Sequence, residues 1–100
     1  MTGLEYQELA MRSMRPDFSI DDMLMNGSMG LAGETGEVVD ILKKYFWHGR
    51  SLNEEHILEE LGDVIWYVAE ICNALGYDVD EVMKRNIEKL KKRWPSGFKF

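Results

Sequence analysis

The stretch NEEHILEELGDVIWYVAEICNAL, residues 53–75, decides the fold class of this chain. Its apolar side chains recur every three or four residues, which places them on one face of an α-helix; they are Leu61, Ile65, Val68, Cys72 and Leu75. Gly76 follows directly and is typical of a helix C-terminus. Glu60 and Asp63 stand three residues apart and therefore share a helical face. The stretch predicts an amphipathic helix that carries two carboxylates beside its apolar stripe.

Three further helices are predicted around this one, and no segment shows the alternation of a β-strand. They span about residues 4–15, 29–46 and 79–94, with a short turn or helix over 19–26. Thr2 and Glu5 have the spacing of a capping box. Ser28 is the candidate cap of the helix over 29–46, and Asp78 with Glu81 caps the last helix. Four helices with short joints predict a single all-α domain over residues 1–100, a four-helix bundle-like fold.

Glycines inside the helix over 29–46 are an unusual feature, because each costs about 1 kcal/mol relative to alanine. They stand at Gly30, Gly33 and Gly36, next to acidic residues. Two explanations are open: close packing of another helix, or close approach of a ligand.

The chain is rich in large apolar side chains for its 100 residues, with three Trp, four Tyr, four Phe and seven Met. A domain of this size buries only a modest core. Apolar faces left over by one chain can be covered by another, which predicts a homodimer or homotetramer that completes the bundle. The last helix is expected to bury one face, made of Val79, Met83, Ile87, Leu90 and Trp94.

The net charge of −6, from 18 acids and 12 bases, argues against binding of a nucleic-acid polymer, which needs a basic surface. Cys72 is the only cysteine, so no intrachain disulfide forms and a reducing compartment is indicated. The N-terminus lacks a signal-peptide pattern, and the longest apolar run, residues 64–69, is too short to span a membrane. A cytoplasmic protein without membrane contact is expected.

A second acidic pair, Glu34 and Glu37, has the same i, i+3 spacing as Glu60 and Asp63. Two such helices packed antiparallel can aim four carboxylates at one point. Like charges about 6 Å apart repel by about 3 kcal/mol per pair at an effective dielectric constant near 20. Either the carboxylates diverge into water, as a lone pair of this kind usually does, or a cation lies between them. Clusters of oxygen ligands suit Mg²⁺, with Mn²⁺ as a second choice.

Three segments resemble one known family. They are GLAGETGEVVD (30–40) followed by Lys43 and Lys44, ELGDVIWY (60–67), and NIEKLKKRWPSGF (86–98). Together they resemble the MazG-like all-α nucleoside triphosphate pyrophosphohydrolases, whose signature is E-x-x-E, a gap of about a dozen to under thirty residues, and E-x-x-D. Here the gap is residues 38–59, 22 positions. The resemblance covers about residues 29–98.

The resemblance implies Mg²⁺-dependent hydrolysis of nucleoside or deoxynucleoside triphosphates to the monophosphate and pyrophosphate, with nucleotide-pool clean-up as the role. The implied metal ligands are Glu34, Glu37, Glu60 and Asp63. A metal-bound water would attack the substrate directly, because no Ser, Cys or His stands beside a base as a nucleophile. Glu34 and Glu37 are both candidates to orient or deprotonate that water, and the sequence does not choose between them.

Candidate substrate-binding residues lie on three of the predicted helices and one joint: Lys44, Trp47, Tyr67, Asn86, Lys89 and Arg93. The basic residues have an alternative as a solvated face or as partners of a helix C-terminus. The family's tail motif favours binding for Asn86 and Lys89 and leaves Arg93 open. Trp47 and Tyr67 can stack on a base, with core packing as the alternative.

Other readings of the acidic pairs remain. A ferritin-like redox-metal bundle needs E-x-x-H pairs, and neither His48 nor His56 stands three residues after a glutamate; both are expected at the surface. A non-catalytic nucleotide-binding helical oligomer is a second alternative. Within the enzyme class, dUTPase-like or phosphoribosyl-ATP pyrophosphohydrolase activity is the nearest one. Asp40 and Glu70 continue the two acidic faces and can support the metal ligands from outside.

Overall fold

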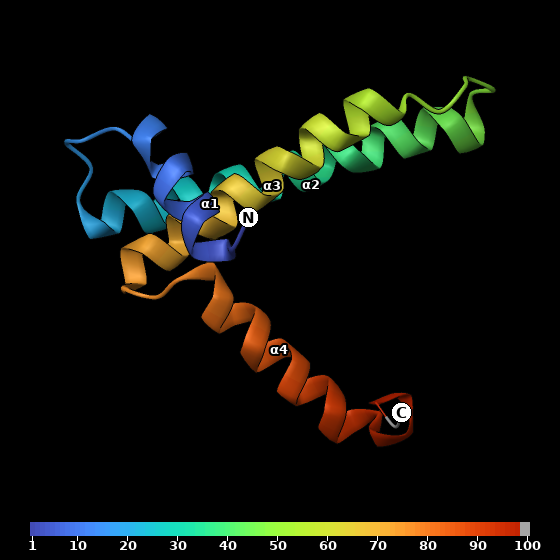
Figure 1. The fold of residues 1–100 in the computed structure, drawn as a ribbon. Helices are drawn as coiled ribbons and strands as arrows, with labels where there is room; N and C mark the ends of the chain where they lie inside the picture. Colours follow the sequence, from blue (N-terminus) through green and yellow to red (C-terminus); the bar gives the residue numbers. More distant parts are fainter. Residues whose placement is uncertain (99–100) are drawn as a thin grey trace.

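A long antiparallel pair of helices forms the body of the molecule (Figure 1). The computed structural model describes residues 1–98, and its regular structure there is entirely helical, which confirms the predicted all-α class. The elements are α1 (Gly3–Ala10), a 3₁₀ turn (Met11–Ser13), α2 (Ile20–Trp47), α3 (Glu54–Leu75), α4 (Val79–Arg93) and a second 3₁₀ turn (Pro95–Phe98). At 1.5 Å per residue, α2 is about 42 Å long and runs almost the full 44 Å of the molecule.

The continuity of α2 differs from the prediction. A separate segment over 19–26 and a helix beginning after Ser28 were expected, whereas one helix runs from Ile20 to Trp47. Ser28 caps nothing; its hydroxyl donates to the Met25 carbonyl within the helix. Helix α3 packs closely on two of the glycines of α2. A Cβ on Gly30 would lie 2.2 Å from the Tyr67 ring, and one on Gly27 would lie 2.6 Å from Ile71. The explanation by close helix packing therefore holds for Gly30.

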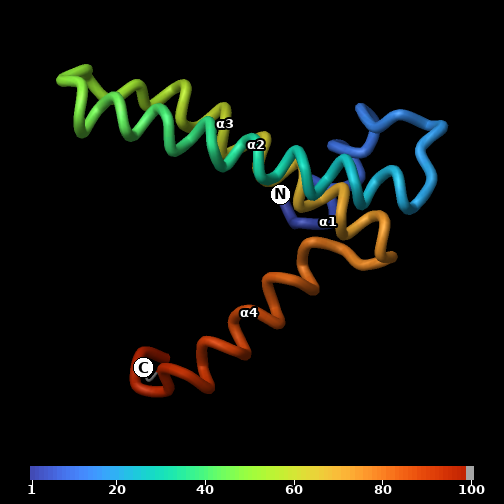
Figure 2. The backbone as a smooth tube through the Cα atoms, turned by 180° about the vertical axis from the view of Figure 1, so that it is seen from behind, coloured from blue at the N-terminus to red at the C-terminus, as the bar shows by residue number. Residues whose placement is uncertain are grey.

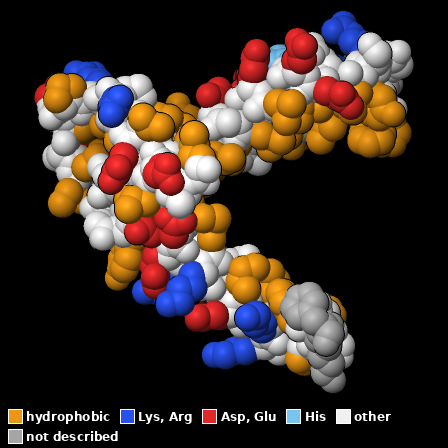
Figure 3. Space-filling view, in the orientation of Figure 1, with side chains coloured by type: hydrophobic (Ala, Val, Ile, Leu, Met, Phe, Trp, Pro, Cys, Tyr) orange, Lys and Arg blue, Asp and Glu red, His pale blue; other side chains and the backbone are white. Residues whose placement is uncertain are grey.

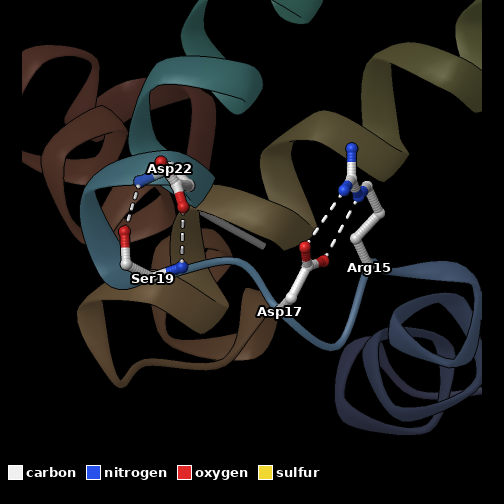
Figure 4. Close-up of polar contacts among 4 residues, drawn as sticks. All are labelled: Arg15, Asp17, Ser19 and Asp22. Atoms are coloured by element: carbon white, nitrogen blue, oxygen red, sulfur yellow. Dashed lines mark hydrogen bonds and ion pairs between the residues drawn. The ribbon is translucent and has the colours of Figure 1, made fainter.

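The turn before α2 is shaped by local polar contacts (Figure 4). Ser19 and Asp22 form a reciprocal capping box at the first turn of α2. Arg15 and Asp17 form an ion pair with 3.0 Å between Nη2 and Oδ2, and such an exposed pair contributes little free energy. The capping box, and not the ion pair, therefore defines where α2 begins.

Helix α1 lies across the end of the hairpin near the connection between α3 and α4 (Figure 2). The buried Gln7 donates to the carbonyl of Tyr77 and accepts from the N–H of Val79. The carboxylate of Asp80 accepts from the N–H groups of Gly3 and Leu4. These bonds join α1 to the start of α4. Each stabilises the contact, because it pairs a backbone or amide group that would otherwise have no partner.

The buried core is small and lies at this same end of the hairpin. Ala69, Cys72 and Ala74 of α3 are buried, and the Cys72 thiol is free. Glu70 is also completely buried, and its carboxylate accepts from the Asn26 amide at 2.9 and 3.0 Å. Burial raises the pKa of Glu70, and the bond from Asn26 partly opposes this. Glu70 thus supports the packing of α2 on α3, two turns away from Asp63.

Helix α4 leaves the hairpin and makes few contacts with it (Figure 1). The prediction that α4 buries one face is wrong for the single chain, since no residue of α4 is buried. Met83, Ile87 and Trp94 are 48%, 43% and 66% exposed. One chain therefore supplies the four helices without closing a bundle. None of the helices in residues 1–98 combines the length and the apolar character needed to cross a lipid bilayer.

Candidate metal and nucleotide site

Three carboxylates meet where the middles of α2 and α3 face each other. Glu34 comes from α2, and Glu60 and Asp63 come from successive turns of α3. One oxygen of each lies within 4.8 Å of the other two. The antiparallel pairing produces this meeting, because residues three apart on α3 share the face that packs against α2. We call these residues the carboxylate cluster.

The electrostatics of the cluster centre on Glu34. Its Oε2 is buried and has no hydrogen-bond partner among residues 1–98. The neighbouring Glu60 carboxyl, which can share its proton, is the largest cause that raises the pKa of Glu34 to about 7; burial and the charges of Glu60, Asp63 and Glu37 act in the same direction. A bound cation would replace that proton and pair the buried oxygen. The donor set is all oxygen, which fits a hard divalent cation such as Mg²⁺ or Mn²⁺.

Glu37, the fourth predicted metal ligand, stands one turn further along α2. It is exposed and does not join the carboxylate cluster. Its charge nevertheless contributes to the raised pKa of Glu34. The structure therefore brings three of the four predicted ligands together and places the fourth beside them.

His56 is a contact of the cluster that the sequence analysis did not anticipate. Its Nε2 lies 3.2 Å from Oε1 of Glu60, whose side chain is 16% exposed. The two residues stand at i and i+4 on α3, which is the spacing of side chains that meet on a helix. That spacing was the signal in the sequence. Carboxylates that bind metals are commonly held by such an outer partner.

A cavity of about 370 Å³ adjoins the cluster on the side toward α1. It is lined by Ser13, Glu34, Asp63, Trp66 and Tyr67. The Trp66 and Tyr67 rings meet edge to face, with centroids 5.2 Å apart. The indole N–H of Trp66 is already bonded to the Ala10 carbonyl and the Ser13 hydroxyl. The predicted base-stacking residue Tyr67 therefore lies beside the carboxylates, with a ring that close packing on Gly30 holds in place.

A second cavity, of about 560 Å³, lies between the cluster and the tip of the hairpin. We call it the tip cavity. Its polar lining includes Glu37, Asp40, Lys44, Arg50, Ser51 and His56. The predicted substrate-binding residue Lys44 pairs with Asp40 at 2.9 Å, and hydrogen bonding to Lys44 is the largest cause that lowers the pKa of Asp40.

The remaining predicted substrate residues are not gathered here by the single chain. Trp47 is the last residue of α2 and is 81% exposed. Asn86, Lys89 and Arg93 are exposed on α4 and line neither cavity. These four assignments remain predictions.

The carboxylates gathered on this helical hairpin form an all-oxygen donor set, which suits the hard divalent cations that bind phosphate substrates. The comparison with known families shows to which family the chain belongs. Residues 26–98 match the family described as the MazG nucleotide pyrophosphohydrolase domain, and the chain belongs to that family. The resemblance stated from the sequence motifs is thereby confirmed.

Two relatives were found among curated proteins. The gene 37 protein of Mycobacterium phage L5 is 38% identical over 74 residues, covering 70% of this chain and 65% of the phage protein. The uncharacterized protein YvdC of Bacillus subtilis strain 168 is 38% identical over 45 residues, covering 45% of this chain and 42% of the bacterial protein. The chain thus spans less than two thirds of each relative. No solved structure matches it.

Proposed function

We propose that this protein hydrolyses nucleoside or deoxynucleoside triphosphates to the monophosphate and pyrophosphate, with Mg²⁺ as the cofactor and Mn²⁺ as a substitute, and that it clears unwanted nucleotides. The observation that carries the proposal is the carboxylate cluster, with its buried unpartnered Glu34 oxygen, on the acidic motifs of a pyrophosphohydrolase family. A charge arrangement of this kind is poorly suited to a purely structural role.

The chain's own residues divide the chemistry between them. When bound, a divalent cation supplies charge neutralisation on the triphosphate and a more acidic water. Glu34, Glu60 and Asp63 would hold it, with Glu60 oriented by His56. Water attacks the α-phosphorus, the bond from the α-phosphorus to the bridging oxygen breaks, and pyrophosphate leaves with that oxygen. Glu37 is exposed beside the cluster rather than engaged in it, which supports Glu37 over Glu34 as the acceptor of the water's proton.

The cavity by Tyr67 is the proposed place of the nucleobase. Stacking on an aromatic ring contributes about 1–3 kcal/mol and tolerates any base. The Ser13 hydroxyl lines the same cavity and can accept a hydrogen bond from the base or sugar, because its own proton is donated to the Ala10 carbonyl. This placement keeps the α-phosphate next to the carboxylate cluster.

A second copy of the chain is proposed to complete the site. Helix α4 projects away from the hairpin with Met83, Ile87 and Trp94 exposed. Figure 3 shows hydrophobic side chains along one edge of the hairpin as well. Pairing of these surfaces in a homodimer or homotetramer would cover them and bring Asn86, Lys89 and Arg93 of one chain to the phosphates bound by another.

Product analysis with a panel of nucleotides tests the reaction. The panel contains ribo- and deoxynucleoside triphosphates, including dUTP, together with phosphoribosyl-ATP, each with and without Mg²⁺. Monophosphate and pyrophosphate that appear only with metal are expected. Diphosphate and inorganic phosphate would overturn the bond assignment. A folded protein that binds nucleotides and Mg²⁺ without turnover would instead be a binding protein.

Substitution of the acids tests their roles. We expect Glu37→Gln to lower kcat by about 100-fold or more, in the range of a lost general base. Asp63→Asn is expected to weaken Mg²⁺ binding by at least about 10-fold. Glu59→Gln is the matched control, because Glu59 is an exposed acid next to Glu60 that is outside the cluster. Turnover and calorimetric Mg²⁺ titration measure the effects, and wild-type values for both site variants would refute the assignment.

A further inference from the structure

The tip cavity holds a set of cationic and hydrogen-bonding groups that the proposed chemistry at the cluster does not use. It lies between the last turns of α2, the connection over 48–53 and the first turn of α3. Lys44, Arg50 and Ser51 line it together with His56. Its volume of about 560 Å³ exceeds that of the cavity beside Tyr67.

The charged side chains of the tip cavity differ in whether they already form an ion pair. Lys44 is paired with Asp40. Arg50 has no ion-pair partner within the part of the chain that the structure describes. Glu37 brings one further negative charge to the lining. The cavity therefore offers one guanidinium that no ion pair within the described residues engages.

The tip cavity is continuous with the carboxylate cluster along both helices. Glu37 follows Glu34 by one turn of α2, and His56 precedes Glu60 by one turn of α3 and contacts it. One turn is about 5.4 Å. The cavity beside Tyr67 lies on the opposite side of the cluster. An extended molecule that crosses the cluster therefore has an aromatic cavity at one end and a cationic cavity at the other.

We propose that the tip cavity is the subsite for the terminal phosphates of the substrate, bound by the Arg50 guanidinium and the Ser51 hydroxyl. The proposal rests on the proposed function, because it takes the scissile phosphate to lie at the cluster and the base at Tyr67. A guanidinium forms paired hydrogen bonds to phosphate oxygens, and an uncommitted one breaks no existing ion pair when it does so. The subsite would select triphosphates over monophosphates.

Binding of inorganic tripolyphosphate in the presence of Mg²⁺ tests this subsite without any assumption about the base. Isothermal titration calorimetry compares the wild type with Arg50→Ala, Arg50→Lys and Lys91→Ala. We expect Arg50→Ala to weaken binding by about 10- to 100-fold, the range for hydrogen bonds to charged groups. Arg50→Lys should retain part of the affinity, because it keeps the charge and loses the paired geometry. Lys91→Ala removes an equal charge from an exposed position on α4 and should bind like the wild type.

The outcomes separate this proposal from the proposed function. Equal tripolyphosphate affinity of the wild type and Arg50→Ala overturns the subsite, and so does equal weakening by Lys91→Ala, even if nucleotides are hydrolysed. Selective weakening by Arg50→Ala supports the subsite. Product analysis on the same samples then tests the reaction independently. Circular dichroism checks that the variants remain folded, as expected for an exposed side chain in a connection.

Discussion

Glu34 and Glu37 stand one helical turn apart on α2 and meet different surroundings. Glu34 points into a cluster with two other carboxylates and has an unpartnered buried oxygen. Glu37 is exposed and lines the tip cavity. The surroundings of Glu34 raise its pKa, and this has a measurable consequence for stability.

The metal-free protein is expected to lose stability as the pH rises from about 4.5 to about 7. Glu34 has a pKa of about 7 in the folded protein against 4.5 ordinarily. The folded state thus binds the proton more tightly than the unfolded chain, so the stabilising contribution is complete below the unfolded pKa and is lost as the pH passes the folded pKa. Melting temperatures measured in EDTA across this range give the slope.

Glu34→Gln provides the comparison, because glutamine does not titrate. Its melting temperature should change less over the same range. The buried Glu70 also has a raised pKa and contributes with the same sign to both proteins, so the difference between them isolates Glu34. Melting temperatures that change equally with pH in the two proteins would show that the Glu34 carboxyl does not have the raised pKa. Added Mg²⁺ should stabilise the wild type most near pH 7 and above, where it no longer competes with that proton.

At the scale of the helices, the close packing of α2 on α3 decides which glycines of α2 are needed. A Cβ on Gly30 would meet the Tyr67 ring at 2.2 Å, whereas a Cβ on Gly33 would meet nothing within 4 Å. The two positions lie in one helix and differ in their neighbours on α3. Packing against α3 therefore requires glycine at Gly30, whereas no neighbour on α3 requires it at Gly33.

Gly30→Ala is expected to destabilise the protein by about 1–3 kcal/mol, the usual cost of overpacking, although alanine favours a helix. Gly33→Ala is the matched control and should stabilise it by up to about 1 kcal/mol, since only helix propensity changes. Urea denaturation measures both. Equal effects of the two substitutions would mean that Tyr67 does not depend on Gly30. Because Tyr67 lines the proposed base cavity, Gly30→Ala should also weaken nucleotide binding.

The whole molecule is more open than a typical domain of its length. Its radius of gyration is 16.3 Å, against about 13 Å for a compact chain of 100 residues. The openness comes from α4 and from the half of the hairpin beyond the small core (Figure 3). Exposed apolar side chains on both parts are the physical reason to expect association.

Ile87→Asn is expected to shift the protein toward a monomer of 11.6 kDa. Ile87 is 43% exposed in the single chain, so its replacement should act on association and leave the fold of the monomer intact. Lys92→Asn, on the same helix, is the control and should keep the mass of the wild type. Light scattering after size exclusion measures the masses. A wild type that remains at 11.6 kDa at every concentration would contradict the proposed assembly.

Local interactions allowed the sequence by itself to determine the presence of the helices and several of their ends. The capping residues Thr2 and Asp78 and the left-handed Gly76 act within a few residues of themselves. Each of these residues can therefore be recognised from the neighbouring sequence. The i, i+3 spacing of Glu60 and Asp63 is local in the same way. The acidic motifs also identified the family, because their order and spacing lie along the chain.

Only the tertiary structure decided how these parts meet. The helix runs unbroken through Gly27 and Gly30 because residues some forty positions later fill the space above them. The separation of Glu37 from Glu34, and the two cavities on either side of the cluster, follow from the register of α2 against α3. The exposure of α4 depends on its angle to the hairpin. Contacts between distant residues set all of these features, and periodicity along one helix carries no information about them.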